Sequence, residues 1–146
     1  MENTTSRLLH PELTDKIIGV YYEVYNEVGH GFLESVYSNC MYLALCIAGL
    51  TVRREVSIPV YFRGSDVGRF KADLVVAGCV LIELKATQNL DRSHEAQVLN
   101  YLRGTELEIA LLFNFGGHKP QFRRFVLENG NKKIRAYPRS SAVEIP

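Results

Sequence analysis

The chain has 146 residues, of which 47% are hydrophobic, and this length and composition suit one globular domain with a buried core. Its formal net charge is +1, so no overall basic field marks it as a nucleic-acid binder. No run is long and apolar enough to span a membrane, and the first residues lack the layout of a signal peptide. We therefore expect a cytoplasmic protein.

The cysteines and the basic residues are distributed unevenly. Three cysteines without Cys-x-x-Cys spacing or a nearby histidine partner are predicted to be buried, reduced thiols, namely Cys40, Cys46 and Cys79. Basic residues gather towards the end of the chain, at Lys119, Arg123, Arg124, Lys132, Lys133, Arg135 and Arg139. They fit either a patch that contacts phosphates or a solvated edge strand and tail.

Two helices are predicted first. Over residues 11–28, apolar residues recur at helical spacing, and Gly29 follows as a helix end. After the break at Gly29-His30-Gly31, residues 33–48 carry a second apolar stripe that Gly49 closes.

Three strands follow, because the hydrophobic period changes to two. Residues 55–62 form the first, and Pro59 within it predicts an edge position. After a turn at 63–66, residues 68–76 place Phe70, Ala72, Leu74 and Val76 on one face and Arg69, Lys71 and Asp73 on the other. A tight turn at Ala77-Gly78 leads to residues 79–86. This strand buries Val80, Ile82 and Leu84 and turns Leu81, Glu83 and Lys85 to the opposite face.

The remaining elements are a helix and two strands. Asn89 or Asp91 caps a helix over 91–103, the apolar run 109–115 predicts a strand covered on both faces, and 121–127 a weaker one. The resulting order, α-α-β-β-β-α-β-β, predicts an α/β fold with a mixed central sheet flanked by helices. We expect one domain over residues 1–128 and a polar tail over 129–146.

The chemistry concentrates on two neighbouring strands. Adjacent strands joined by a short turn bring Asp73 beside Glu83, and strand alternation places Glu83 and Lys85 on one face. Charges on an apolar sheet are costly unless something compensates them, and Mg²⁺ bound by two carboxylates would do so. Lys85 would then orient or deprotonate the attacking water, or stabilise charge on a phosphate. The alternative is a Glu-Lys pair on a solvated strand face.

These residues resemble the PD-(D/E)XK nuclease superfamily, and the chain most resembles its small GxxExxY family. The family motif appears as Gly31-Phe32-Leu33-Glu34-Ser35-Val36-Tyr37. Similar segments are Leu13-Thr14, Phe70-Lys71-Ala72-Asp73-Leu74, Val80-Leu81-Ile82-Glu83-Leu84-Lys85, His94-Glu95-Ala96-Gln97-Val98-Leu99-Asn100-Tyr101-Leu102 and Leu111-Leu112-Phe113-Asn114-Phe115-Gly116. The resemblance covers roughly residues 8–127. Ala72 replaces the proline of the superfamily's name, and that proline contributes no ligand.

The resemblance implies a restriction-endonuclease-like fold and further site residues. Glu34 matches the helix glutamate that joins the metal site, although it also suits a helix dipole. Gln97 and Tyr101 share a helix face and resemble the Gln-x-x-x-Tyr element of RecB-like nucleases, which supports the site. His94 is read as a capping or surface residue, and Asn114 as structural.

The sequence thus predicts a nuclease that needs Mg²⁺ or Mn²⁺ and hydrolyses phosphodiester bonds of DNA or RNA. Asp73, Glu83 and Glu34 would bind the metal, Lys85 would position the water, and Gln97 and Tyr101 would support them. The alternatives are a non-catalytic module of the same fold that binds nucleic acid or a protein partner, and a structural protein whose Asp-Glu-Lys group is a salt-bridge cluster. A homodimer is expected on analogy with small nucleases that cut two strands.

Overall fold

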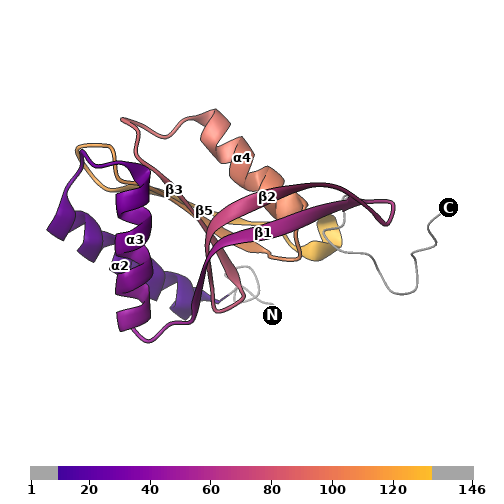
Figure 1. Ribbon diagram of the computed structural model, residues 1–146, viewed down its shortest axis with the longest axis horizontal. Helices are drawn as coiled ribbons and strands as arrows, with labels where there is room; N and C mark the ends of the chain where they lie inside the picture. Colours follow the sequence, from indigo (N-terminus) through magenta and orange to yellow (C-terminus); the bar gives the residue numbers. More distant parts are fainter. Residues whose placement is uncertain (1–9, 133–146) are drawn as a thin grey trace, which may run out of the picture.

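The computed structural model describes residues 10–132, in which helices and strands follow the predicted order (Figure 1). The predicted tail beyond Lys132, with its basic residues, and residues 1–9 lie outside this range. The elements are α2 (Pro11–Val28), α3 (Glu34–Ile47), β1 (Val52–Phe62), β2 (Ser65–Val76), β3 (Val80–Lys85), α4 (Arg92–Arg103), β4 (Ile109–Asn114), β5 (Gln121–Val126) and the 3₁₀ turn η1 (Asn129–Asn131).

The strands form one mixed sheet in the order β1-β2-β3-β4-β5. All neighbours run antiparallel except β3 and β4, which are parallel and are connected through α4. A parallel pair needs such a crossover, and here the helix supplies it. The predicted mixed sheet flanked by helices is confirmed, as is the edge position of the strand that contains Pro59.

Helices cover both faces of the sheet. α2 and α3 pack against one face, where their apolar residues form a core with Leu74, Ile82 and Phe113. α4 packs against the other face, where Val98 and Leu102 meet a second cluster. Figure 1 shows this layering, and it also shows the β1–β2 hairpin extending away from the centre of the sheet. No helix within residues 10–132 has the length and apolarity needed to cross a membrane.

The faces of β2 differ from the prediction. Leu74 and Val76 face α2 and α3, but Phe70 and Ala72 belong to the cluster under α4. Simple alternation would keep all four on one face, so that expectation is wrong. The change occurs at Asp73, where β2 has already parted from β3, because their pairing covers only Leu74–Val76. Freed from one neighbour, the β1–β2 ribbon twists more strongly than a central strand does.

The end of the described chain is tied to the domain. Lys132, predicted as part of a basic patch or tail, is buried and donates hydrogen bonds of 2.7 Å to the carbonyls of Thr105 and Leu107. Burial lowers its pKa to about 8. Lys132 is therefore a structural anchor and is withdrawn from any phosphate contact.

The cysteines are more accessible than predicted. All three are free thiols, but Cys46 is exposed, and Cys40 and Cys79 are half-buried. The expectation of buried thiols is therefore wrong for Cys46, which lies on the outward side of α3.

Candidate active site

Asp73, Glu83 and Lys85 meet where β2 and β3 separate. The last β2–β3 pair joins Leu74 to Ile82, so the next position on each strand is Asp73 and Glu83. Leu84 points into the core on the side of α2 and α3, and Glu83 and Lys85 therefore face the side of α4, as predicted from strand alternation.

The Asp73 carboxylate accepts a hydrogen bond from the backbone of β3 at the point where the β2–β3 pairing ends. Its Oδ2 accepts a 2.8 Å hydrogen bond from the backbone N–H of Leu84. That N–H lies just past the end of the β2–β3 ladder and would otherwise lack a partner from β2. The bond leaves Oδ1 of Asp73 without a hydrogen bond to the described part of the protein.

Glu83 is an ionisable group in an apolar setting. The residue is 6% exposed, and its Oε1 has no hydrogen-bond partner among the described residues. Burial raises its pKa from an ordinary 4.5 to about 8; the charge of Asp73 adds to the rise and that of Lys85 opposes it. The pKa of Asp73 is also raised, first by burial. Two carboxylates thus share a site that disfavours their negative charge.

Lys85 does not neutralise these carboxylates by direct pairing. It forms no ion pair with another described residue, whereas Arg69 pairs with Asp66 and Arg123 with Glu95. The reading of Asp73, Glu83 and Lys85 as an internal salt-bridge cluster therefore finds no support in the geometry.

Glu34 approaches the site from the first turn of α3. Its charge is among the lesser causes that raise the pKa values of Asp73 and Glu83, after burial. Its position depends on Tyr37, whose hydroxyl donates to Gly29 O at 2.5 Å and accepts from Phe32 N at 3.1 Å. The buried Tyr37 thereby folds the loop that leads into the helix.

Glu34 is nevertheless not gathered with the other two carboxylates. Within residues 10–132, no group of three or more His, Cys, Asp or Glu side chains is arranged to hold a metal ion. α3 packs against the sheet face opposite to that of Glu83, and Glu34 is exposed. The predicted set of Asp73, Glu83 and Glu34 is therefore not brought together. Of these three carboxylates, only Asp73 and Glu83 lie side by side as candidate ligands of a cation.

The pair fits a divalent cation in its donor chemistry. Hard oxygen ligands from one or two carboxylates, completed by waters, are what Mg²⁺ takes in phosphate-processing sites. Oε1 of Glu83 is buried and has no hydrogen-bond partner among the described residues. A cation there would offset the cost of ionising both groups.

Gln97 and Tyr101 flank the carboxylates from α4. The amide of Gln97 donates to the Tyr101 hydroxyl at 3.0 Å, and the Tyr101 ring stacks on Phe70 with centroids 3.9 Å apart. Burial raises the pKa of Tyr101, and the charges of Glu83 and Asp73 add to the rise. The predicted shared face is confirmed, and it lies beside the acidic pair. His94 instead completes the capping box of α4 with Asp91.

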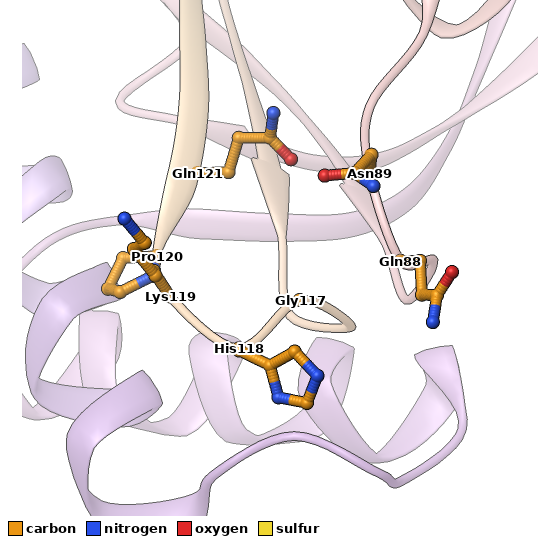
Figure 2. Close-up of a pocket in the computed structure, with 7 residues that line it drawn as sticks. All are labelled: Gln88, Asn89, Gly117, His118, Lys119, Pro120 and Gln121. Atoms are coloured by element: carbon orange, nitrogen blue, oxygen red, sulfur yellow. The ribbon is translucent and has the colours of Figure 1, made fainter.

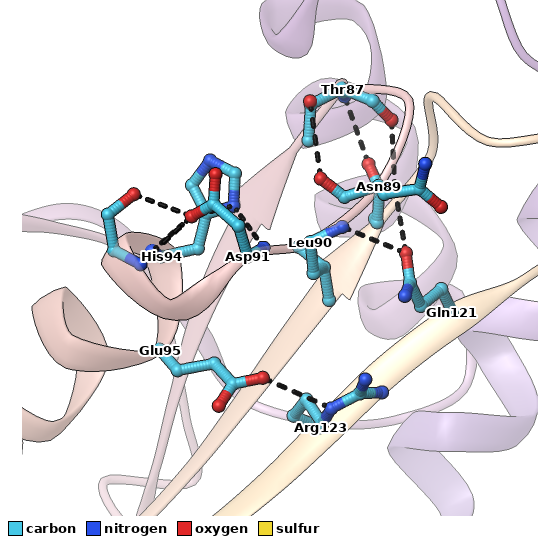
Figure 3. Close-up of polar contacts among 10 residues, drawn as sticks. Thr87, Asn89, Leu90, Asp91, His94, Glu95, Gln121 and Arg123 are labelled. Carbon is cyan, nitrogen blue, oxygen red and sulfur yellow. Dashed lines mark hydrogen bonds and ion pairs between the residues drawn. The ribbon is translucent and has the colours of Figure 1, made fainter.

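Asn114 and Gln121 fix the loop that follows Lys85. Asn114 is fully buried; its Oδ1 accepts from Thr87 N at 3.0 Å, and its Nδ2 donates to Thr87 O at 2.9 Å. Gln121 Oε1 accepts from Leu90 N at 3.0 Å, as Figure 3 shows. The structural role predicted for Asn114, which ends the apolar strand β4, agrees with these contacts. The role of Gln121 was not predicted, because this residue begins β5 and no apolar run precedes it.

Tyr21 extends this network into the core. Its hydroxyl donates to Asn114 O at 2.5 Å, and the N–H of Gln121 donates back to it at 2.9 Å. Burial raises the pKa of Tyr21 above its usual range, so it stays a protonated donor. A buried chain of hydrogen bonds thus runs from α2 to the residues beside Lys85.

One family model matches most of the chain. The model, described as the PD-(D/E)XK nuclease superfamily, matches residues 11–125, which include every candidate site residue named above. Comparisons with curated proteins and with solved structures gave no significant match.

Proposed function

This chain belongs to the PD-(D/E)XK nuclease superfamily, and from that premise we propose that it hydrolyses phosphodiester bonds of DNA or RNA with the help of Mg²⁺ or Mn²⁺. The observation that carries the proposal is the buried Glu83, whose Oε1 lacks a partner beside Asp73. Such an atom is costly in a purely structural protein, because an unsatisfied buried polar group destabilises the fold.

Asp73 and Glu83 would hold the cation. Oδ1 of Asp73 and the buried Oε1 of Glu83 form no hydrogen bond with the described residues. A divalent cation bound there would supply Lewis-acid charge at a phosphate and lower the pKa of a water. Glu34 would act from outside this pair, through an ordered water, because it is exposed and stands apart from them.

Lys85 would orient the attacking water and stabilise charge on the phosphate. It shares the strand face of Glu83 and is not held by an ion pair in the described structure. Gln97 would hold the hydroxyl of Tyr101, whose ring is fixed by stacking on Phe70, so that this hydroxyl can meet the substrate.

We also propose that the chain belongs to the GxxExxY family within that superfamily. Gly31 has a φ of +116°, a conformation that other residues rarely adopt. Tyr37 binds the backbone of the same loop, and Glu34 starts the helix that the loop introduces. Gly31, Glu34 and Tyr37 thus each contribute differently to the loop that leads into α3 and to the start of that helix. These different roles give a physical reason for their spacing.

The test is cleavage of single- and double-stranded DNA and RNA by the full chain with Mg²⁺ or Mn²⁺. Lys85→Ala should lower the cleavage rate by about 10²- to 10⁴-fold, the usual range for loss of a positioned proton-transfer group. Lys16→Ala, an exposed lysine on α2, is the matched control and should cleave like the wild type. Unchanged cleavage in Lys85→Ala would reject the assignment.

Metal binding separates an enzyme from a non-catalytic module of the same fold. Binding of Mn²⁺, followed by calorimetry and by anomalous scattering in a soaked crystal, should be lost in Glu83→Gln and Asp73→Asn and kept in Lys85→Ala. Absence of Mn²⁺ at Asp73 and Glu83, together with absence of cleavage, would favour the binding module. Pairing of two copies stays a prediction, which sedimentation of the purified chain tests.

A further inference from the structure

A cavity of about 430 Å³ opens between two loops close to Lys85, and no role proposed so far uses it. One wall is the loop after β3, and the other is the loop that joins β4 to β5 (Figure 2). The lining residues are Gln88, Asn89, Gly117, His118, Lys119, Pro120 and Gln121. The first of them, Gln88, is three residues beyond Lys85 in the sequence, so one wall belongs to the loop that leaves the strand of the candidate lysine.

The two walls are held rigidly. The backbone N–H of Phe115 donates to Lys85 O at 2.8 Å, and Asn114 binds both backbone groups of Thr87. At Gly116, a Cβ would lie only 2.3 Å from the backbone of Thr87, so the loops approach too closely for any side chain there. The Tyr25 hydroxyl on α2 donates to Gly117 O. The cavity is therefore preformed, and a ligand would not need to order its walls.

Polar groups at the rim are free to bind. The side chains of Gln88, Asn89 and Lys119 form no hydrogen bond or ion pair with the part of the chain that the structure describes. Among residues 10–132, His118 makes only an edge-on contact with the ring of His30, at a centroid distance of 5.0 Å. In Figure 2 the amides of Asn89 and Gln121 extend into the space between the loops. The oxygen of Gln121 is already used by Leu90, which leaves its amide nitrogen available.

The chemistry of this rim suits a nucleotide. Asparagine and glutamine amides carry a donor and an acceptor side by side and pair with the edge of a base in bidentate fashion. Lysine and histidine suit a phosphate, and the lining contains no acidic residue that would repel one. The volume lies within the roughly 300–1,000 Å³ of ordinary small-ligand pockets.

We propose that this cavity binds one unpaired nucleotide of the substrate strand, next to the bond that is cut. Asn89 and Gln88 would read the edge of the base, and Lys119 with His118 would hold a phosphate. A base in such a cavity has left its stack, so the substrate is single-stranded at this position or has a nucleotide turned out of the duplex. The inference rests on the proposed nuclease function, because it takes the ligand to be part of the strand that is cleaved.

The test uses the full chain in EDTA, where metal-dependent cleavage cannot occur. The four 5′-ribonucleoside monophosphates and their 2′-deoxy counterparts are titrated separately, and binding is followed by backbone and side-chain amide NMR. Binding should shift resonances of residues 88–89 and 117–121. Comparison of the ribose and deoxyribose series shows which sugar the site prefers, and preference for either agrees with the proposal.

Two variants and two matched controls give the decisive comparison. Asn89→Ala and Lys119→Ala should each weaken nucleotide binding by about fivefold or more, as expected for one lost base or phosphate contact. Asn131→Ala and Lys16→Ala replace exposed residues of the same types elsewhere and should bind like the wild type. The side chains of Asn89 and Lys119 make no hydrogen bonds in the described protein, and the Asn89 carbonyl that accepts from Thr87 Oγ1 is retained in Asn89→Ala. All four variants should therefore fold, which thermal unfolding checks.

Three results would overturn the inference: no shifts at millimolar nucleotide, shifts confined to other residues, or inorganic phosphate reproducing every shift that the nucleotides cause. Failure of this site and failure of the nuclease proposal are distinguishable. Cleavage without nucleotide shifts at the two loops would remove the subsite alone. Nucleotide binding without cleavage in any metal would remove the catalytic proposal and leave the cavity as a nucleotide site.

Discussion

Replacing Glu83 by glutamine should stabilise the metal-free protein at alkaline pH and leave it unchanged at acidic pH. The pKa of Glu83 is raised from 4.5 to about 8 in the folded protein, mainly by burial and next by the charge of Asp73. The folded state therefore holds a proton that the unfolded state releases between these two values. The stability that this proton supplies is complete below pH 4.5 and is lost as the pH rises towards 8.

The size of the effect follows from the separation of the two pKa values. At about 1.4 kcal/mol per pKa unit, the free energy of unfolding should fall by roughly 4 kcal/mol between pH 4.5 and 8 on account of Glu83. Glutamine cannot ionise, so Glu83→Gln removes this loss. At pH 8.5 in EDTA, the variant should exceed the wild type by roughly 3–4 kcal/mol, and at pH 4.5 the two should agree.

Urea denaturation followed by circular dichroism at several pH values measures this difference directly. Glu23→Gln changes an exposed glutamate of α2 in the same way and should follow the wild type at every pH. Adding Mn²⁺ at pH 8 should stabilise the wild type and not Glu83→Gln, by about 2.7 kcal/mol at a hundredfold excess over the dissociation constant. A stability difference independent of pH, or a variant weaker than the wild type at pH 8.5, would refute the reasoning.

Three further substitutions test the supports of the site, each by urea denaturation alongside cleavage assays. Asn114→Ala leaves the backbone groups of Thr87 unpaired, so it should cost about 1–3 kcal/mol and slow cleavage. Tyr37→Phe keeps the ring but releases Gly29, so it should cost about 1 kcal/mol and weaken cleavage through Glu34. Lys132→Met leaves two carbonyls without a donor and should cost about 1–3 kcal/mol while cleavage is unchanged in the molecules that remain folded.

Much of the fold could be predicted from hydrophobic periodicity. In β3, Val80, Ile82 and Leu84 face the core under α2 and α3, and Leu81 faces the core under α4. The apolar residues of this strand therefore alternate between the two faces of the sheet, and a period of two is recognisable in the sequence. The boundary of β1 was less visible. It begins at Val52, three residues before the predicted start. Polar residues on an edge strand can form backbone bonds without leaving a hydrophobic signal.

The supports of the site were harder to predict, because they depend on contacts distant in sequence. Asn114 binds Thr87 across 27 residues, and Lys132 reaches back to Thr105 across the same number. A buried amide and a buried ammonium look like surface residues in a sequence, where they are usually solvated. Only the folded chain shows that their polar atoms satisfy carbonyl and N–H groups between the elements.

The separation of β2 from β3 explains why the site needs more than the right residues at the right spacing. If the ladder continued past Leu74, the N–H of Leu84 would be bound by a backbone carbonyl and Asp73 would have no such partner. Because the strands part there, the Asp73 carboxylate enters the gap and is held beside Glu83 by a backbone bond. The same opening is where a cation and a phosphate could approach. The same residues on two fully paired strands would lack this opening for a cation and a phosphate. The divergence of β2 from β3 is therefore part of the candidate site.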